Sequence, residues 1–196
     1  MLIRVSALES FRRWRLDEEL PIGDLMNSLT SNVETEAMRR GTALHKALEI
    51  AEPGEHETLA AMGYTFTFAG GIVAVPAVRE VRAYGRYGEL TVTGQTDGLD
   101  GIVIVDHKTT SSFDAEKYLA GYQWRFYLDL FHADIFRWQV FEVREGGDER
   151  AYNVGEPHKL TAYRYPGMRQ DCEALAGEFT AFARDFLPAD FGRVAA

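Results

Sequence analysis

The chain has 196 residues, of which 46% are hydrophobic and 26% are charged, a composition typical of a globular domain that buries a sizeable core. It carries 21 Lys and Arg against 30 Asp and Glu, so its formal net charge of −9 argues against non-specific coating of polyanions but leaves room for a local anion-binding cleft. The single cysteine, Cys172, excludes an internal disulfide and a cysteine-ligated zinc or iron–sulfur site.

Apolar periodicity predicts a helix from Glu34 to Ala51, which Pro53 and Gly54 end. Short β-branched and aromatic segments separated by glycine turns then predict five strands, Tyr64–Phe68, Ile72–Val75, Val78–Tyr84, Leu90–Thr96 and Ile102–Asp106. A second helix from Ser112 or Asp114 to about Phe131, two strands (Ile135–Arg144 and Thr161–Tyr165) and an amphipathic helix carrying Met168 to Phe186 follow. This order predicts an α/β fold of the α+β type, with a central antiparallel or mixed sheet flanked by helices.

The hairpin around Asp100-Gly101 holds the most informative residues. A two-residue turn there would pair Leu99 with Ile102 and Asp97 with Ile104. Because side chains alternate along a strand, Asp97, Asp106 and Lys108 would share one face, with the two carboxylates on diagonal positions roughly 7 Å apart. Such a pair can share one divalent cation. The alternative is a solvated hairpin end with an Asp–Lys ion pair.

His107 has the opposite parity, so we expect its ring to point away from the two aspartates and to pack on the other face. Only its main-chain carbonyl would then reach a metal bound by them.

These residues resemble the PD-(D/E)XK nuclease superfamily, in particular its RecB-like branch with the phage exonucleases. The resemblance rests on Gly94-Gln95-Thr96-Asp97 followed by Asp106-His107-Lys108. Further matches are Gly41 to His45, similar to a helical Gly-x-x-x-His motif, Glu80 as an acidic strand residue, and Gln123 to Tyr127, similar to a Gln-x-x-x-Tyr motif. Thr96 replaces the proline of the superfamily name, and the cysteines of an iron–sulfur cluster are missing, so no cluster is expected.

The resemblance implies a restriction-endonuclease-like core in a single nuclease domain over residues 1–196, with an N-terminal helical segment and a C-terminal helix. It assigns Asp97 and Asp106 as ligands of one or two Mg²⁺ or Mn²⁺ ions and Lys108 as the residue that orients or deprotonates water. Glu80, His45 and the His107 carbonyl would complete the metal site, while Gln123 and Tyr127 support the lysine or hold DNA. The alternative for Glu80 is a surface ion pair with Arg79 or Arg82, and for His45 a structural role.

Basic residues near these motifs predict where DNA would approach. Arg39 and Arg40 precede His45, and Arg82 and Arg86 follow Glu80. The aromatic residues near the motifs could stack exposed bases, although most aromatic residues of this chain are expected in the core; they are Tyr84, Tyr87, Tyr118 and Trp124.

We therefore expect a metal-dependent deoxyribonuclease, an exonuclease acting on DNA ends in recombination or repair. A structure-specific endonuclease, a non-catalytic DNA-binding or scaffolding relative, and an unrelated α/β domain with a chance motif are the alternatives. Analogy with the branch adds a single-strand annealing protein and a ring-shaped homo-oligomer as partners. No apolar window approaches the ~18 residues of a membrane span, and Met1–Trp14 lacks a signal-peptide core, so we expect a cytoplasmic protein of bacterial or phage origin.

Overall fold

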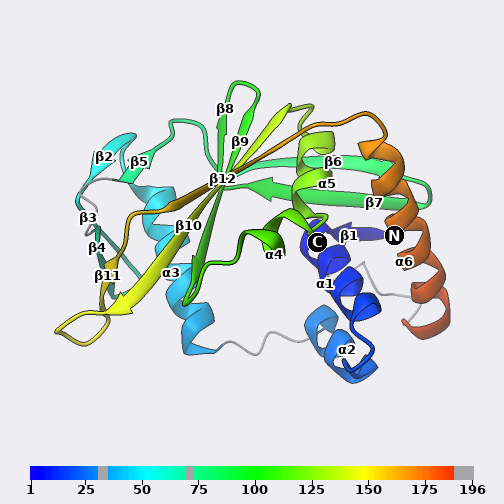
Figure 1. The fold of residues 1–196 in the computed structure, drawn as a ribbon, viewed down its shortest axis with the longest axis horizontal. Coiled ribbons are helices and arrows are strands. Elements are labelled where there is room, and N and C mark those ends of the chain that lie inside the picture. Colours follow the sequence, from blue (N-terminus) through cyan, green and yellow to red (C-terminus); the bar gives the residue numbers. More distant parts are fainter. Residues whose placement is uncertain (31–34, 69–72, 188–196) are drawn as a thin grey trace.

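The computed structural model describes residues 1–30, 35–68 and 73–187. Mixed sheets with helices packed beside them form the fold (Figure 1), as the sequence predicts. The helices are α1 (Val5–Leu16), α2 (Ile22–Thr30), α3 (Glu36–Ile50), α4 (Ala115–Leu119), α5 (Gln123–Leu130) and α6 (Met168–Phe186). No helix within these ranges is long and apolar enough to cross a membrane.

The described strands form three sheets. One has the order β1 (Leu2–Arg4), β7 (Leu90–Thr96) and β6 (Val81–Tyr87), with β1 parallel to β7. The largest has the order β3 (Thr58–Ala61), β4 (Tyr64–Phe68), β11 (Ala151–Val154), β10 (Ile135–Glu145), β9 (Val103–Thr110) and β8 (Gly98–Asp100), and β12 (His158–Tyr163) also pairs with β10. The third joins β2 (Gly54–His56) to β5 (Val73–Val75). Parallel pairs β9–β10 and β4–β11 make the large sheet mixed.

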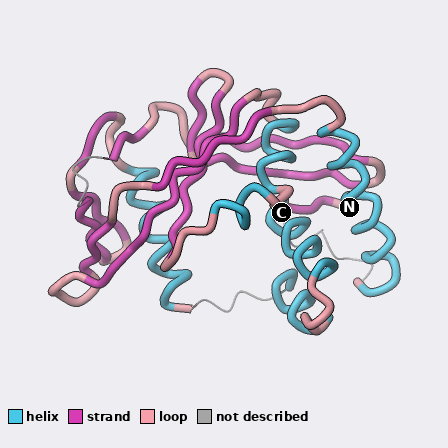
Figure 2. The backbone as a smooth tube through the Cα atoms, in the orientation of Figure 1, coloured by secondary structure: helices cyan, strands magenta, loops and turns pink. Residues whose placement is uncertain are grey.

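The sheets carry two separate hydrophobic clusters. The larger cluster, which includes Ile104, Trp138 and Phe179, packs α1, α5 and α6 against the β1–β7–β6 sheet and one face of β9 and β10. The smaller one, which includes Leu44 and Phe141, packs α3 against β3, β4, β5, β11 and the C-terminal part of β10. Figures 1 and 2 show these groups at opposite ends of the molecule, with β9 and β10 running between them. Any site on β9 therefore lies between two cores.

Most predicted elements occur where the sequence places them. The helix predicted from Glu34 is α3, which begins at Glu36, and Glu34 itself lies outside the described residues; β4, β7 and α6 begin and end as predicted. Other predicted bounds differ from the structure: β9 runs to Thr110 instead of ending at Asp106, and β12 begins at His158 instead of Thr161. The strand expected from Val78 begins at Val81, because Val78 forms a bridge to Leu99 instead. The helix expected up to Phe131 is divided into α4 and α5. Ile72, the first residue of another predicted strand, lies outside the described residues.

Glu9 ties α1 to the start of α5. Its side chain is buried, its Oε1 accepts a 2.8 Å hydrogen bond from Arg12 Nη2, and its Oε2 accepts one of 2.7 Å from the Tyr122 N–H. Since Tyr122 is the N-cap residue of α5, this carboxylate fixes where the helix with Gln123 and Tyr127 begins.

Replacing Glu9 should destabilise the protein strongly. We expect Glu9→Ala to lower the free energy of unfolding by about 2–4 kcal/mol, because a buried guanidinium and a main-chain N–H both lose their partner. Urea denaturation measures the change, and Glu18→Ala at an exposed position is the matched control. A loss below about 0.5 kcal/mol, the usual range for surface substitutions, would contradict this role.

Candidate metal centre

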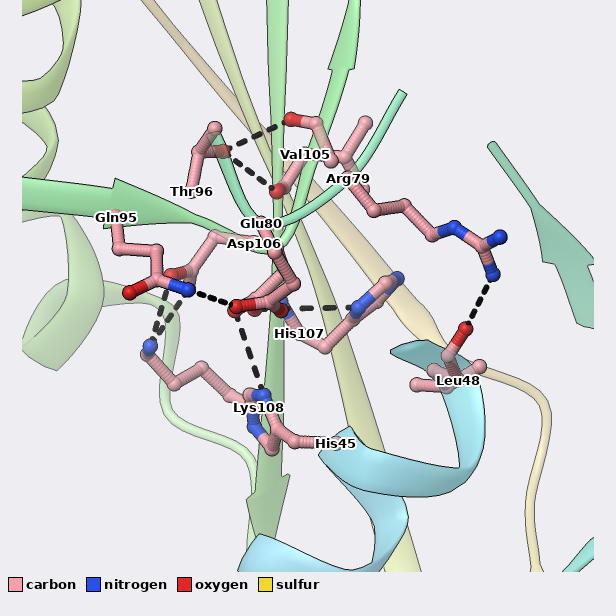
Figure 3. Close-up of polar contacts among 12 residues, drawn as sticks. His45, Leu48, Arg79, Glu80, Gln95, Thr96, Val105, Asp106, His107 and Lys108 are labelled. Atoms are coloured by element: carbon pink, nitrogen blue, oxygen red, sulfur yellow. Dashed lines mark hydrogen bonds and ion pairs between the residues drawn. The ribbon is translucent and has the colours of Figure 1, made fainter. Parts of the chain in front are cut away.

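The candidate site lies where β7, β8 and β9 meet (Figure 3). Asp106 and Lys108 project from one face of β9, and the Lys108 Nζ lies 2.9 Å from Asp106 Oδ1 and 2.8 Å from Oδ2. Asp97 occupies the bend between β7 and β8, where its Oδ2 accepts a 2.6 Å hydrogen bond from the main-chain N–H of His107. The structure thus brings together the three charged side chains that the hairpin pattern singles out.

The register of the hairpin differs from the predicted one. Leu99 pairs with Ile104 and Asp100 with Val103, so the turn residues are Gly101 and Ile102 rather than Asp100 and Gly101. Gly101 has a φ of 57°, the left-handed conformation that glycine adopts without a Cβ clash. The ladder is therefore shifted by two residues, which places Asp97 opposite Asp106 instead of diagonal to it. A shift of two keeps every side chain on its predicted face.

The His107 ring corrects another expectation. It is buried and packs 6.0 Å from the Phe141 ring, as a second-face residue would, but its Nδ1 also lies 3.9 Å from Asp97 Oδ2. Asp97 lies in the bend before β8 and accepts a hydrogen bond at the edge of β9, from the main-chain N–H of His107. From this position its carboxylate can approach the His107 ring, although the alternation along β9 places that ring on the other face. The main-chain carbonyl of His107 faces the same edge, because the N–H and C=O of one strand residue point to the same side.

His45 reaches the site from α3. Its Nδ1 lies 3.4 Å from Asp97 Oδ1, and its ring is 6.3 Å from that of His107. Gly41, one helical turn earlier, allows this approach, since a Cβ at Gly41 would lie 3.1 Å from the hydroxyl oxygen of Thr109 on β9. The spacing from Gly41 to His45 therefore has a physical basis: the glycine brings the helix close to the strand, and the histidine meets the aspartate.

Glu80 enters from the segment before β6 with a φ of 54°, an uncommon conformation for a non-glycine residue. Its Oε2 accepts a 2.5 Å hydrogen bond from Gln95 Nε2. The predicted alternative, an ion pair with Arg79 or Arg82, is not what the structure has. Arg79 donates to the carbonyls of Leu48 and Ala51 at the end of α3, and Arg82 donates to Gln95.

Gln95 is two residues before Asp97, so their side chains share one face of the strand, but this alternation alone indicates no role for Gln95. In the structure it bonds to three other residues. Beyond its bonds to Glu80 and Arg82, its main-chain carbonyl accepts a 2.9 Å hydrogen bond from the Tyr127 hydroxyl, and Gln123 hydrogen-bonds to Tyr127 in turn. A Cβ at Gly94 would lie 3.2 Å from the Tyr127 ring, so this glycine lets α5 pack onto β7.

The ionisable groups influence one another. Burial raises the pKa of Asp106, with Lys108 opposing the rise and Asp97 adding to it. Burial would also raise the pKa of Asp97, but the hydrogen bond and charge of His45, together with Lys108, lower it below its ordinary value. Burial and the charge of Asp97 raise the pKa of Glu80. The charge of Asp97 thus raises the pKa of both Asp106 and Glu80, and a cation bound among these carboxylates would stabilise their ionised forms.

The donor atoms suit a hard divalent cation. Carboxylate and carbonyl oxygens are available from Glu80, Asp97, Asp106 and His107, and a ring nitrogen from His45. Asp106 Oδ2 is buried and makes no hydrogen bond, although the Lys108 ammonium lies beside it. Within the described part of the chain, no three acidic, histidine or cysteine side chains are already gathered around one point. The residues therefore fit a metal site by the chemistry of their donor atoms, while Lys108, Gln95 and His45 are the present partners of the carboxylates.

The four arginines predicted to bind DNA fall into two groups. Arg39 pairs with Glu36 of the same helix at 3.1 Å. The Arg40 guanidinium lies 5.3 Å from the centre of the Tyr152 ring, so it packs α3 onto β11. Arg82 and Arg86 are exposed on β6. The structure does not gather the four into one rim around the site.

No family model matches this sequence, and no curated protein matches it. A solved structure described as "Crystal structure of SSO0001" has a similar fold, with a TM-score of 0.51 and 16% sequence identity. The alignment covers 92% of this chain and 76% of that chain. At this level of identity the likeness concerns the fold alone, and it supports the mixed α/β class predicted from the sequence.

Proposed function

We propose that this protein is a metal-dependent deoxyribonuclease of the PD-(D/E)XK type, with a restriction-endonuclease-like core. The observation that carries the proposal is the convergence of Asp97, Asp106 and Lys108 at one edge of β9, with the Lys108 Nζ 2.9 Å from Asp106. His45 lies beside Asp97, and Glu80 is held nearby by Gln95, so two further segments contribute side chains to this region (Figure 3). An ordinary structural ion pair would not need a second and a third carboxylate beside it.

Each residue has a role in phosphodiester hydrolysis. Asp97 and Asp106 would hold one or two Mg²⁺ or Mn²⁺ ions, with Glu80, His45 and the His107 carbonyl completing the donor set. A cation bound there lowers the pKa of a water molecule and offsets charge on the phosphate oxygens. Lys108 orients the attacking water and stabilises the charge that develops on the phosphate. Gln95 positions Glu80 through its side-chain amide, and the Tyr127 hydroxyl ties α5 to the Gln95 carbonyl.

Metal binding should be visible as stabilisation. We expect Mn²⁺ at about 100 times its dissociation constant to raise the free energy of unfolding by about 2.7 kcal/mol, which is about 5–10 °C in Tm for a domain of this size. His45 contributes a nitrogen ligand, which favours Mn²⁺ over Mg²⁺. Asp97→Asn, which keeps an acceptor for the His107 N–H, should lose most of the shift. Asp100→Asn at the exposed hairpin end should retain it, and an equal shift in both variants would contradict the assignment.

The activity is tested on end-labelled linear DNA and closed-circular DNA, each with Mg²⁺, Mn²⁺ or EDTA. Metal-dependent loss of linear DNA alone supports an exonuclease acting on ends in recombination or repair. Cleavage of circles would identify a structure-specific endonuclease instead, and no cleavage with either metal would refute the nuclease. On the exonuclease proposal, the natural partners are DNA ends in the cytoplasm and a single-strand annealing protein, with a homo-oligomer as the working form.

A further inference from the structure

The β1–β7–β6 sheet has one face that the core does not use. Residues of β7 and β6 that point into the larger hydrophobic cluster include Val92 and Tyr87. The alternate residues lie on the other face, and the strand register aligns them in rows: Arg4 beside Thr93 and Tyr84, then Gln95 beside Arg82, and Thr91 beside Arg86. Figure 2 shows the three strands running side by side. We call this set of residues the outer face.

The outer face carries exposed aromatic and basic side chains that the packing of the core does not require. Tyr84 is 61% exposed and lies between Arg82 and Arg86, which are exposed too. None of the positions named on the outer face is acidic, although the whole chain has a formal charge of −9. An aromatic ring between two guanidinium groups can stack on a base while the arginines contact phosphates on either side. Two arginines four residues apart on a strand span about 13 Å, which leaves room for a nucleotide between them.

A pocket lies between the outer face and Gln95, the residue that bonds to Glu80. It has a volume of about 350 Å³, and its lining includes Arg4, Arg82, Gln95 and Tyr127. Arg4 and Arg82 bring positive charge to it from two different strands. Gln95 also donates to Glu80, so the pocket adjoins the carboxylates. A chain of phosphates that follows β6 would therefore pass this pocket before it reaches Asp106 and Lys108.

We propose that the outer face binds a single strand of nucleic acid and leads it to the metal centre. Tyr84 stacks on an unpaired base, Arg82 and Arg86 hold the flanking phosphates, and the pocket between Arg4 and Arg82 takes the phosphate next to the site of cleavage. A duplex hides its base faces within the stack, so this arrangement selects single strands or frayed ends. This inference rests on the proposed nuclease function and adds to it the strandedness of the substrate.

Binding is measured in EDTA, where no cleavage occurs, with a fluorescent oligo(dT) and a duplex hairpin of equal length. We expect the wild type to bind the oligo(dT) more tightly, and Tyr84→Ala to weaken that binding about tenfold or more, while Tyr84→Trp retains it. Arg86→Gln should reduce the slope of log K against log salt by about 0.7, the value for one contact to a single strand. Tyr163→Ala removes a tyrosine that is 65% exposed on another strand and is the matched control.

The outcomes separate this inference from the nuclease proposal. Binding that depends on Tyr84 in a protein that cleaves no DNA supports the outer face and refutes the hydrolytic function. Cleavage by a protein in which Tyr84→Ala and Tyr163→Ala bind oligo(dT) equally well overturns the outer face and leaves the nuclease. Tighter binding of the duplex than of oligo(dT) also overturns the inference.

Discussion

Asp106→Asn should abolish DNA cleavage without destabilising the fold. Asp106 is 5% exposed at the centre of the site, and removing its charge takes away one of the two ligands that would hold the cation. We expect the cleavage rate to fall about 10²- to 10³-fold, the usual cost of losing one electrostatic contact to a transition state. Gel assays on end-labelled DNA with Mn²⁺ measure the loss.

The stability of the same variant tests the physical reason. The raised pKa of Asp106 means that its ionised form is less favourable in the folded protein than in the unfolded chain. Removing that charge offsets the weaker contact with Lys108, whose ammonium can still donate to the amide oxygen, so the substitution should cost little free energy of unfolding. Asp100→Asn, on the exposed end of the hairpin, controls for the chemical change. A variant that unfolds readily but cleaves at the wild-type rate would show that the Asp106–Lys108 pair is structural.

Lys108→Met should reduce both DNA cleavage and the stability of the fold. Asp106 and Asp97 hold the pKa of Lys108 above its ordinary value against the effect of burial, so the charged lysine stabilises the fold at every pH below that ordinary value. We expect a loss of about 1–2 kcal/mol of unfolding free energy, less than for a fully buried pair because 29% of the side chain is exposed. Cleavage should fall about 10²-fold.

The response to metal distinguishes Lys108 from the carboxylates. Without the ammonium, Asp97 and Asp106 repel each other unopposed, so the rise in Tm on adding Mn²⁺ should be as large as in the wild type or larger. Lys159→Met, at an exposed position of β12, is the control for loss of a lysine. A Lys108→Met protein whose Tm no longer responds to Mn²⁺ would mean that the lysine maintains the site and does not act on the water.

The sequence predicts which residues come together better than it predicts how their strands pair. Alternation along a strand and one glycine turn are enough to place Asp97, Asp106 and Lys108 on one face, and this holds even though the register is shifted by two residues. The turn itself was assigned to Asp100-Gly101 because local preference favours it. The pairing that the strands adopt uses Gly101 and Ile102 instead, with Leu99 opposite Ile104.

Local sequence patterns do not predict contacts between segments that are far apart in the chain. The parallel pairing of β1 with β7 joins residues about ninety positions apart, and no local pattern specifies it. The bonds from Gln95 to Glu80, Arg82 and Tyr127 need β6, β7 and α5 to be assembled first. The parity of Gln95 was the available signal, and without the positions of its partners it indicated no role.

The division into two hydrophobic clusters also concerns the dynamics of the protein. His45 belongs to the helix packed in the smaller cluster, whereas Tyr127 is part of the larger one. If the smaller cluster opens by itself, His45 leaves Asp97 while Lys108 and Tyr127 keep their surroundings. Amide hydrogens of α3 would then exchange with solvent faster than those of α5, and the fraction of molecules with a complete site would be set by the less protected of the two units.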